Sequence, residues 1–179
     1  MNKINTTRRL CRAGIIAALY TVLTYVFGAL SHNGFLQIRP AEALCILPLF
    51  FPEAVPALYI GCMISNMASP YFIFDVFFGS IATLLAAFAT YLVGRFLRKE
   101  PVRLIIGGLF PVLFNALLIP FIIVFLCGGG AGFASTKVAY FSYMLSIGFT
   151  QAVWVYTLGS LLYYTLRRLK KKKSRFFRR

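Results

Sequence analysis

Four apolar runs are each long enough to cross a lipid bilayer, and they constrain the fold of this chain more than any other feature. A transmembrane helix needs about 20 predominantly apolar residues, and the four runs are Leu10–Leu30, Phe74–Leu97, Leu104–Cys127 and Val138–Leu166. A soluble domain usually has about a quarter of its residues charged, whereas only 13% of these 179 residues are charged and 60% are hydrophobic. The sequence therefore predicts an all-α integral membrane protein.

The basic residues predict the orientation of the chain. All lysines and arginines except Arg39 and Lys137 fall in three blocks, over residues 1–12, 95–103 and 167–179. Since basic loops stay on the cytoplasmic side, we expect both termini and the 95–103 loop to be cytoplasmic. The net charge of +15 also raises the possibility of nucleic-acid binding. We interpret the basic tail instead as an orientation signal beside anionic membrane lipid, and we predict no nucleic-acid partner.

The segment 41–69 must enter and leave the membrane on one face, because two termini on the same side require an even number of crossings. Prolines at positions 48, 52 and 56 split this segment into two short apolar pieces. The pieces are either two short helices or a re-entrant hairpin, and both put irregular backbone at membrane depth, which is tolerated only inside protein or beside water. We expect one transmembrane domain, residues 1–179, built as a six-helix bundle with a short, proline-broken second and third helix. The approximate helices are 10–30, 41–51, 54–69, 74–98, 103–127 and 137–166, followed by a basic tail over 167–179.

Ionisable side chains inside these apolar segments are candidate binding residues, because each costs about 2.5–3.5 kcal/mol at mid-membrane. Glu42 and Asp75 lie near expected helix starts, where a carboxylate can cap the helix or favour its dipole. Alternatively, each carboxylate accepts N–H donors from a ligand. Arg39 is either an ion-pair partner of Glu42 or a ligand contact. We expect Glu53, at the inner bend, to be solvated or structural, and Glu100 to be solvated.

Three amides, Asn66, Asn115 and Gln151, lie inside apolar helices. Each alone can be explained as a hydrogen bond between helices, worth about 0.6 kcal/mol. Gln151 and Trp154 share a helix face, however, and an amide beside an aromatic ring suits a flat heterocycle. Because the amides and the two carboxylates can converge in the outer half of one bundle, the sequence predicts an outward-facing pocket with one wall formed by residues 37–66.

Catalysis and ATP hydrolysis have no recognisable site in the sequence. The P-loop pattern is absent, so any ATP-driven step requires a partner protein. The one histidine, His32, is expected in an exposed loop, and the four cysteines show neither metal-binding nor redox spacing. The glycine-rich connection 128–136 is flexible and suits a gate better than a phosphate site. We predict that the chain is not an enzyme and holds no metal or cofactor.

Several stretches together resemble the queuosine-precursor transporter (QueT) family. They are IRPAEALCILPLFFPEAVPALYIGC, Asn66, DVFFGSIATLLAAFATYL, FPVLFNAL and GFTQAVWVYTLG, in the same order and spacing from about Arg12 to Tyr164. The blocks RPAEAL and DVxFGSxATL are the most specific. The resemblance implies a substrate-binding S component of an energy-coupling factor (ECF) transporter. Such a component is a six-helix, multi-pass protein of the bacterial cell membrane with both termini cytoplasmic.

The resemblance also implies a ligand and partners. The ligand would be a 7-deazaguanine, namely the cyano or aminomethyl precursor of queuosine, or queuine, captured from outside. A transmembrane coupling subunit and two ATP-binding cassette ATPases would drive its release inwards, so the partners and not this chain would use ATP. In the family at large, small alanines of the first helix dock on the coupling subunit. Ala13 and Ala17 fit that role, although small residues here also suit packing inside the bundle.

Chemistry suggests a role for each candidate residue. A guanine-like edge offers a ring N–H and an amine, which one carboxylate can accept together. Glu42 is the first choice for that role, and Asp75 is the choice for the second carboxylate or for a ligand ammonium. The three amides, Asn66, Asn115 and Gln151, can form hydrogen bonds with the remaining ring atoms of the ligand. Trp154, Tyr71 or Phe74 can stack on its rings.

Two alternatives stay open at this point. One is an S component for another vitamin, since the identity of the ligand rests on the resemblance. The other is a stand-alone small transporter, channel or membrane enzyme. Stand-alone transporters usually contain repeats with matching broken helices, and only one broken pair, over 41–69, is visible here. Co-purification of coupling and ATPase subunits would separate the ECF S component from the stand-alone protein.

Overall fold

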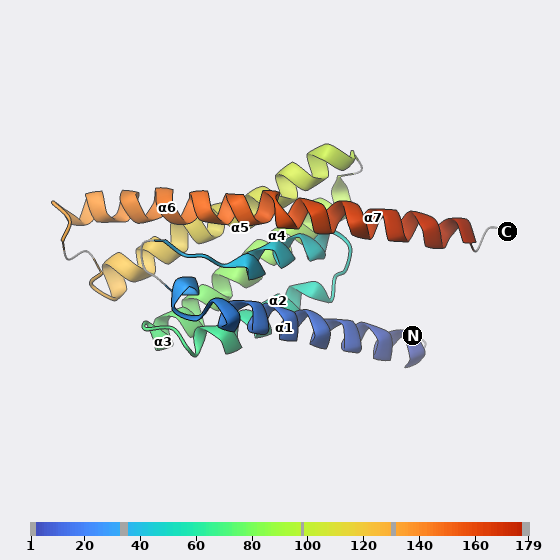
Figure 1. Ribbon diagram of the computed structural model, residues 1–179, viewed down its shortest axis with the longest axis horizontal. Helices are drawn as coiled ribbons and strands as arrows, with labels where there is room; N and C mark the ends of the chain where they lie inside the picture. Colours follow the sequence, from blue (N-terminus) through green and yellow to red (C-terminus); the bar gives the residue numbers. More distant parts are fainter. Residues whose placement is uncertain (1–2, 33–35, 98, 130–131, 177–179) are drawn as a thin grey trace.

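Every regular element of the part of the chain that the structure describes is a helix, as predicted for an all-α membrane protein (Figure 1). The structure is a computed structural model, and it describes residues 3–32, 36–97, 99–129 and 132–176. The elements form six helical segments, several of which change helix type along their length. The first three are α1 (Lys3–Ser31), the 3₁₀ helix η1 (Pro40–Leu49) and α2 (Ala54–Asn66). The fourth consists of α3 (Phe72–Phe74), the π-helix η2 (Asp75–Gly79) and α4 (Ser80–Phe96). The fifth consists of α5 (Glu100–Phe121) and the π-helix η3 (Ile122–Leu126), and the sixth of α6 (Thr136–Tyr156) and α7 (Leu158–Phe176).

Four helical segments within the described residues are long and apolar enough to cross a membrane, and two shorter apolar helices lie between the first and second of them. The protein is therefore a multi-pass membrane protein. The four spans are Thr6–Gly28, Phe72–Phe96, Glu100–Leu126 and Thr136–Lys172.

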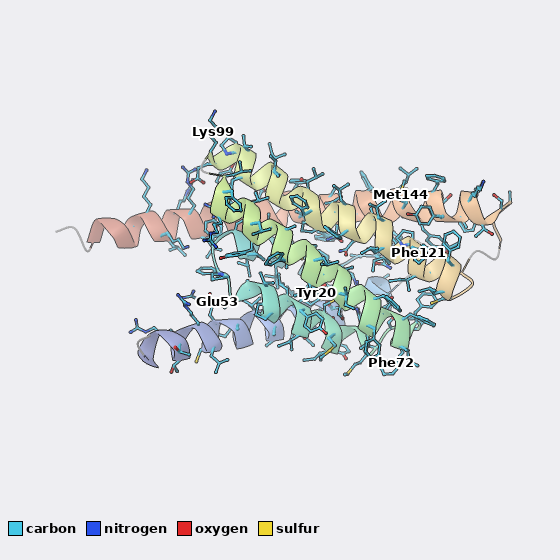
Figure 2. All side chains as sticks on the ribbon, turned by 180° about the vertical axis from the view of Figure 1, so that it is seen from behind. Tyr20, Glu53, Phe72, Lys99, Phe121 and Met144 are labelled. Atoms are coloured by element: carbon cyan, nitrogen blue, oxygen red, sulfur yellow. The ribbon has the colours of Figure 1, made fainter. Side chains whose placement is uncertain are left out.

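Figure 1 shows the start of α1, the end of α4, the start of α5 and the C-terminal half of α7 at the same end of the bundle. The described residues of the three basic blocks are therefore gathered at one end, which we call the basic end. Lys99 and Glu53 both lie at this end in Figure 2. With only Thr157 between them, α6 and α7 extend for about 60 Å at 1.5 Å per residue, so α7 projects past the other helices (Figure 1).

The proline-broken segment forms two short helices. In Figure 1, η1 runs toward the basic end and α2 returns from it. A 3₁₀ helix rises about 2.0 Å per residue and an α-helix about 1.5 Å, so the ten residues of η1 reach as far as the thirteen of α2. All ten are buried, because α1, α4, α5, α6 and α7 pack around η1. This short helix is therefore the centre of the bundle.

Small residues of α4 allow its close approach to η1. Ala82, Ala86 and Thr90, spaced four residues apart on one face, are buried, as small residues are where helices in a membrane pack closely. A Cβ atom added to Gly94 would lie 2.8 Å from Cα of Leu49, so glycine is required there if the backbone is to stay in place.

Two acidic residues stabilise the basic end. Glu53 forms an ion pair with Arg12, which agrees with a structural role. Glu100 accepts a hydrogen bond from the Tyr163 hydroxyl at 2.5 Å and lies 3.3 Å from Nε of Arg167. The Glu100 side chain is 36% exposed, so it is partly solvated as expected, and α7 continues far enough to supply it with two partners.

Candidate binding site

The Glu42 carboxylate joins three elements of the bundle. It is 1% exposed, and its Oε1 accepts a hydrogen bond from the Tyr20 hydroxyl of α1 at 2.9 Å. Its Oε2 accepts from Nε2 of Gln151 in α6 at 2.9 Å and from the Cys45 thiol at 3.2 Å. Glu42 lies in the first turn of η1, but its side chain bonds neighbouring helices. We call these four residues the Glu42 network.

Tyr20 was not among the residues selected from the sequence. Its side chain has no exposed surface, and it follows Ala13 and Ala17 at helical spacing, with Thr24 one turn later. Residues three or four apart share a helix face, and this face packs against α2. A helical wheel drawn through the two alanines would have found Tyr20 as the polar group on their face.

A second group of polar side chains surrounds Asn66, and we call it the Asn66 network. Nη2 of Arg39 donates to Oδ1 of Asn66 at 2.8 Å, and Nδ2 of Asn66 donates to the backbone carbonyl of Asp75 at 2.8 Å. The Ser69 hydroxyl donates to Oδ2 of Asp75. Arg39 does not form an ion pair with Glu42 among the described contacts, so that prediction is wrong: its side chain turns toward α2.

Asp75 begins a π-helical turn and is not a helix cap. The helix starts three residues earlier, at Phe72, and the backbone N–H of Ser80 reaches the Asp75 carbonyl across the wide turn. Single π turns inside α-helices are frequent at functional sites. Here the turn brings Gly79 so close to Asn66 that an added Cβ would lie 3.1 Å from Nδ2 of Asn66.

Four buried polar atoms near this network have no hydrogen-bond partner among the described residues. They are Nε of Arg39, Oδ1 of Asp75, Oγ of Ser80 and Nε2 of His32. More than 90% of buried polar groups in proteins are hydrogen-bonded, so four such atoms around one network are unusual. Together they form a set of donors and acceptors that a polar ligand can satisfy.

The remaining candidates are placed less directly. Asn115 is buried in α5, and no described hydrogen bond joins its side chain to either network. Trp154 is half-buried in α6, while Tyr71 packs partly buried against a cluster that includes Ile123. Phe74 is largely exposed. The structure thus brings five of the predicted residues together in two networks, Glu42 with Gln151 and Arg39 with Asn66 and Asp75.

His32 is buried, whereas the sequence placed it in an exposed loop. Gly28 has a φ of +43°, which breaks the regular helix, and the Ser31 hydroxyl then donates to the carbonyls of Thr24 and Ile38. The chain turns back on itself, and His32 is left 8% exposed with Nδ1 donating to the Gly28 carbonyl at 3.3 Å. The prediction is wrong because a polar segment was assumed to be solvated.

This burial predicts a pH dependence of stability. Burial, and then the charge of Arg39, lower the pKa of His32 below its ordinary 6.5. As the pH falls through 6.5, the unfolded chain therefore binds a proton that the folded protein resists, and the free energy of unfolding decreases until the folded pKa is passed. We expect the melting temperature in detergent to fall over this range for the wild type and to fall less for His32→Gln. His32 is the one histidine of the chain, so equal pH profiles for both proteins would contradict the prediction.

The two alanines predicted to dock a partner pack inside the bundle on one side. Ala13 and Ala17 contact the core cluster that contains Ala54 and Leu58. A Cβ added to Gly61 would lie 2.9 Å from the Ala17 carbonyl, so α1 and α2 are in close contact here. A docking role for the alanines remains a prediction.

These features define a class of protein. A multi-pass helical bundle with buried carboxylates, amides and an arginine at its centre has the construction of a membrane protein that binds or transports a polar solute. A sequence profile of the QueT transporter family matches residues 10–168. The chain belongs to this family, which confirms the resemblance described above, and the family is one of transporters, not enzymes.

A characterised relative adds detail. The chain is 38% identical over 85 residues to the queuosine precursor transporter QueT of Lactococcus lactis subsp. cremoris (strain MG1363). The match covers 46% of this chain and 49% of the relative, so it spans about half the length of each protein. No solved structure matches the chain.

Proposed function

We propose that this protein imports a queuosine precursor of the 7-deazaguanine class, acting as the substrate-binding S component of an ECF transporter in the bacterial cell membrane. The observation that carries the proposal is the pair of polar networks buried inside a bundle of this transporter family. In the membrane such groups are costly and are commonly part of a substrate path.

The chemistry of these side chains suits a deazaguanine. The base presents a carbonyl acceptor, a ring N–H donor and an exocyclic amine on one edge, together with a flat face. Carboxylates and amides complement the edge, and an aromatic ring complements the face. We propose that the ligand site draws on Asn66, Asp75, Asn115, Gln151, Trp154, Arg39 and Tyr71 of the predicted set, and that Glu42, the remaining member, holds α1 and α6 around it.

Orientation and energy supply follow from the charge and from the missing ATP site. We propose that the basic end faces the cytoplasm, since positive loops remain there, and that the site is loaded from outside. The sequence contains no P-loop, so ATP hydrolysis falls to two ABC ATPases joined through a transmembrane coupling subunit. We propose that Ala13 and Ala17 belong to the α1 region that meets this subunit, and that the protein itself uses no cofactor.

Ligand-dependent stability tests this proposal. The purified protein in detergent is heated with and without 7-deazaguanine, its cyano and aminomethyl derivatives, queuine, and an unrelated vitamin such as riboflavin. A ligand that binds only the folded state adds about 4 kcal/mol at a thousandfold excess over its dissociation constant. We expect a clear rise in melting temperature with at least one deazaguanine and none with the vitamin. A response to the vitamin alone would favour an S component for a different substrate.

A further inference from the structure

We propose that the Asn66 network, and not Glu42, reads the hydrogen-bonding edge of the ligand: Oδ1 of Asp75 accepts from its ring N–H, and Nε of Arg39 donates to its carbonyl. The inference rests on the proposed function and deepens it. It reverses the first choice made from the sequence, where Glu42 was expected to receive the ligand.

The two carboxylates differ in how far the protein already satisfies them. Glu42 receives three donors from Tyr20, Gln151 and Cys45 and is almost completely enclosed. To bind a ligand edge it would have to release donors that hold α1 and α6. Asp75 is 9% exposed, and only its Oδ2 has a partner, Ser69, while Oδ1 has none among the described residues.

Arg39 supplies the complementary donor. It is 8% exposed; its Nη2 donates to Asn66, while its Nε has no partner among the described residues. Arg39 and Asp75 are both bonded to Asn66, one to its side-chain oxygen and the other to its side-chain nitrogen. An unpaired donor, Nε of Arg39, and an unpaired acceptor, Oδ1 of Asp75, therefore belong to the two residues that bond the Asn66 amide. Asn66 is held in α2 and Asp75 in the π turn of η2.

Two cavities are lined by residues that neighbour Ser69, the partner of Asp75, along the chain. One, of about 320 Å³, is lined by His32 and Pro70 among others, and one of about 310 Å³ is lined by Pro70, Tyr71 and Cys127 among others. Ser69 donates to Asp75 and accepts from the backbone N–H of Tyr71, so the turn that carries Pro70 and Tyr71 links Asp75 to the lining of both cavities. Their sizes are at the lower end of the range for small-molecule sites.

The order of donors and acceptors selects the class of base. A guanine-type edge presents a carbonyl acceptor beside a ring N–H donor, which matches a free N–H of Arg39 beside a free oxygen of Asp75. The 2-amino group next to the ring N–H can also reach the carboxylate, or the unpaired hydroxyl of Ser80. An adenine-type edge presents the opposite order. A site with buried unpaired groups rejects such a ligand strongly, because those groups then stay unsatisfied.

The test compares isosteric variants against ligands that differ by one group. Affinities of 7-deazaguanine, of 7-deazahypoxanthine, which lacks the 2-amino group, and of 7-deazaadenine are measured by calorimetry on wild type, Asp75→Asn, Glu42→Gln and Ser80→Ala. Glu100→Gln, at the basic end, is the matched control. Size-exclusion profiles and ligand-free melting temperatures show whether each variant is folded. If Asp75→Asn does not fold, Ser80→Ala still tests the proposal.

We expect Asp75→Asn to lose roughly 10- to 100-fold in affinity for 7-deazaguanine, and to lose much of the preference for 7-deazaguanine over 7-deazahypoxanthine. Ser80→Ala should weaken that preference while leaving the ligand-free protein stable. Glu42→Gln and Glu100→Gln should keep the wild-type preference, and 7-deazaadenine should not bind the wild type. If the wild type binds 7-deazaguanine but Glu42→Gln alone abolishes the preference, the inference is overturned and the proposed function stands. If the wild type binds none of the deazaguanines, the proposed function fails and the inference fails with it.

Discussion

The double variant Tyr20→Phe/Gln151→Leu is expected to be less stable than the wild type by about 3–5 kcal/mol, the cost of leaving a buried charge uncompensated. The two changes remove the hydroxyl and amide donors to Glu42 and leave only the Cys45 thiol. A thiol is a weak donor, and water cannot replace the lost donors because the carboxylate is enclosed. The measurement is SDS-driven unfolding in mixed micelles.

Two further proteins separate lost charge compensation from lost packing. Adding Glu42→Leu to the double variant removes the carboxylate and should recover most of the stability, since an apolar side chain of similar volume often replaces a buried polar group at little cost. Tyr25→Phe is the matched control, because it removes a hydroxyl of the same helix that donates to the Ile64 carbonyl at an exposed position, and it should cost less than about 1 kcal/mol. A double variant within 1 kcal/mol of the wild type would show that Glu42 does not depend on these donors.

The general plan of the fold could be read from the sequence because its signals are local. The basic blocks flank the apolar runs directly, and the charge rule needs only their positions along the chain. Pro48 interrupts backbone hydrogen bonding wherever the segment lies, so a short, irregular second helix was predictable. The 3₁₀ form of η1 was not predictable in this way, because it depends on the surrounding helices that bury all ten residues.

The site was predictable in its residue types but not in its pairings. Buried carboxylates and amides are rare in such segments, so Glu42, Asn66 and Asp75 were apparent from the sequence. Their partners were not, since Gln151 is 109 residues from Glu42 and Arg39 is 27 residues from Asn66. Proximity along the chain suggested that Arg39 pairs with Glu42, three residues away. In the folded protein the Arg39 guanidinium instead donates to the amide of Asn66 in α2.

Hidden polar groups were missed for a different reason. Tyr20 lies in an apolar helix where a tyrosine is unremarkable, and its hydroxyl gains importance only because η1 brings Glu42 next to it. His32 was misplaced because the turn at Gly28 was not anticipated. In both cases the missing information was a backbone path: the return of Ile38 to Leu30 at the end of α1 in one case and the inward course of η1 in the other.

Uptake of a labelled deazaguanine is expected only when the partner subunits are present. In a bacterial strain without its own uptake system, cells expressing this chain alone should show only background accumulation. Cells that also express a coupling subunit and two ABC ATPases should accumulate the label well above background. The physical reason is that accumulation against a concentration gradient requires free energy, and the sequence contains no P-loop with which to supply it from ATP.

The control for this experiment is an ATPase subunit whose P-loop lysine, which contacts the transferred phosphate, is replaced by alanine. Assembly should be preserved and accumulation lost. Binding of the ligand to the isolated chain should be unchanged by the ATPase variant, because binding precedes the step that uses ATP. Accumulation by the chain alone, at the rate seen with the full set of subunits, would instead identify a stand-alone transporter. The polar networks would then have to open to both sides of the membrane without ATPase subunits.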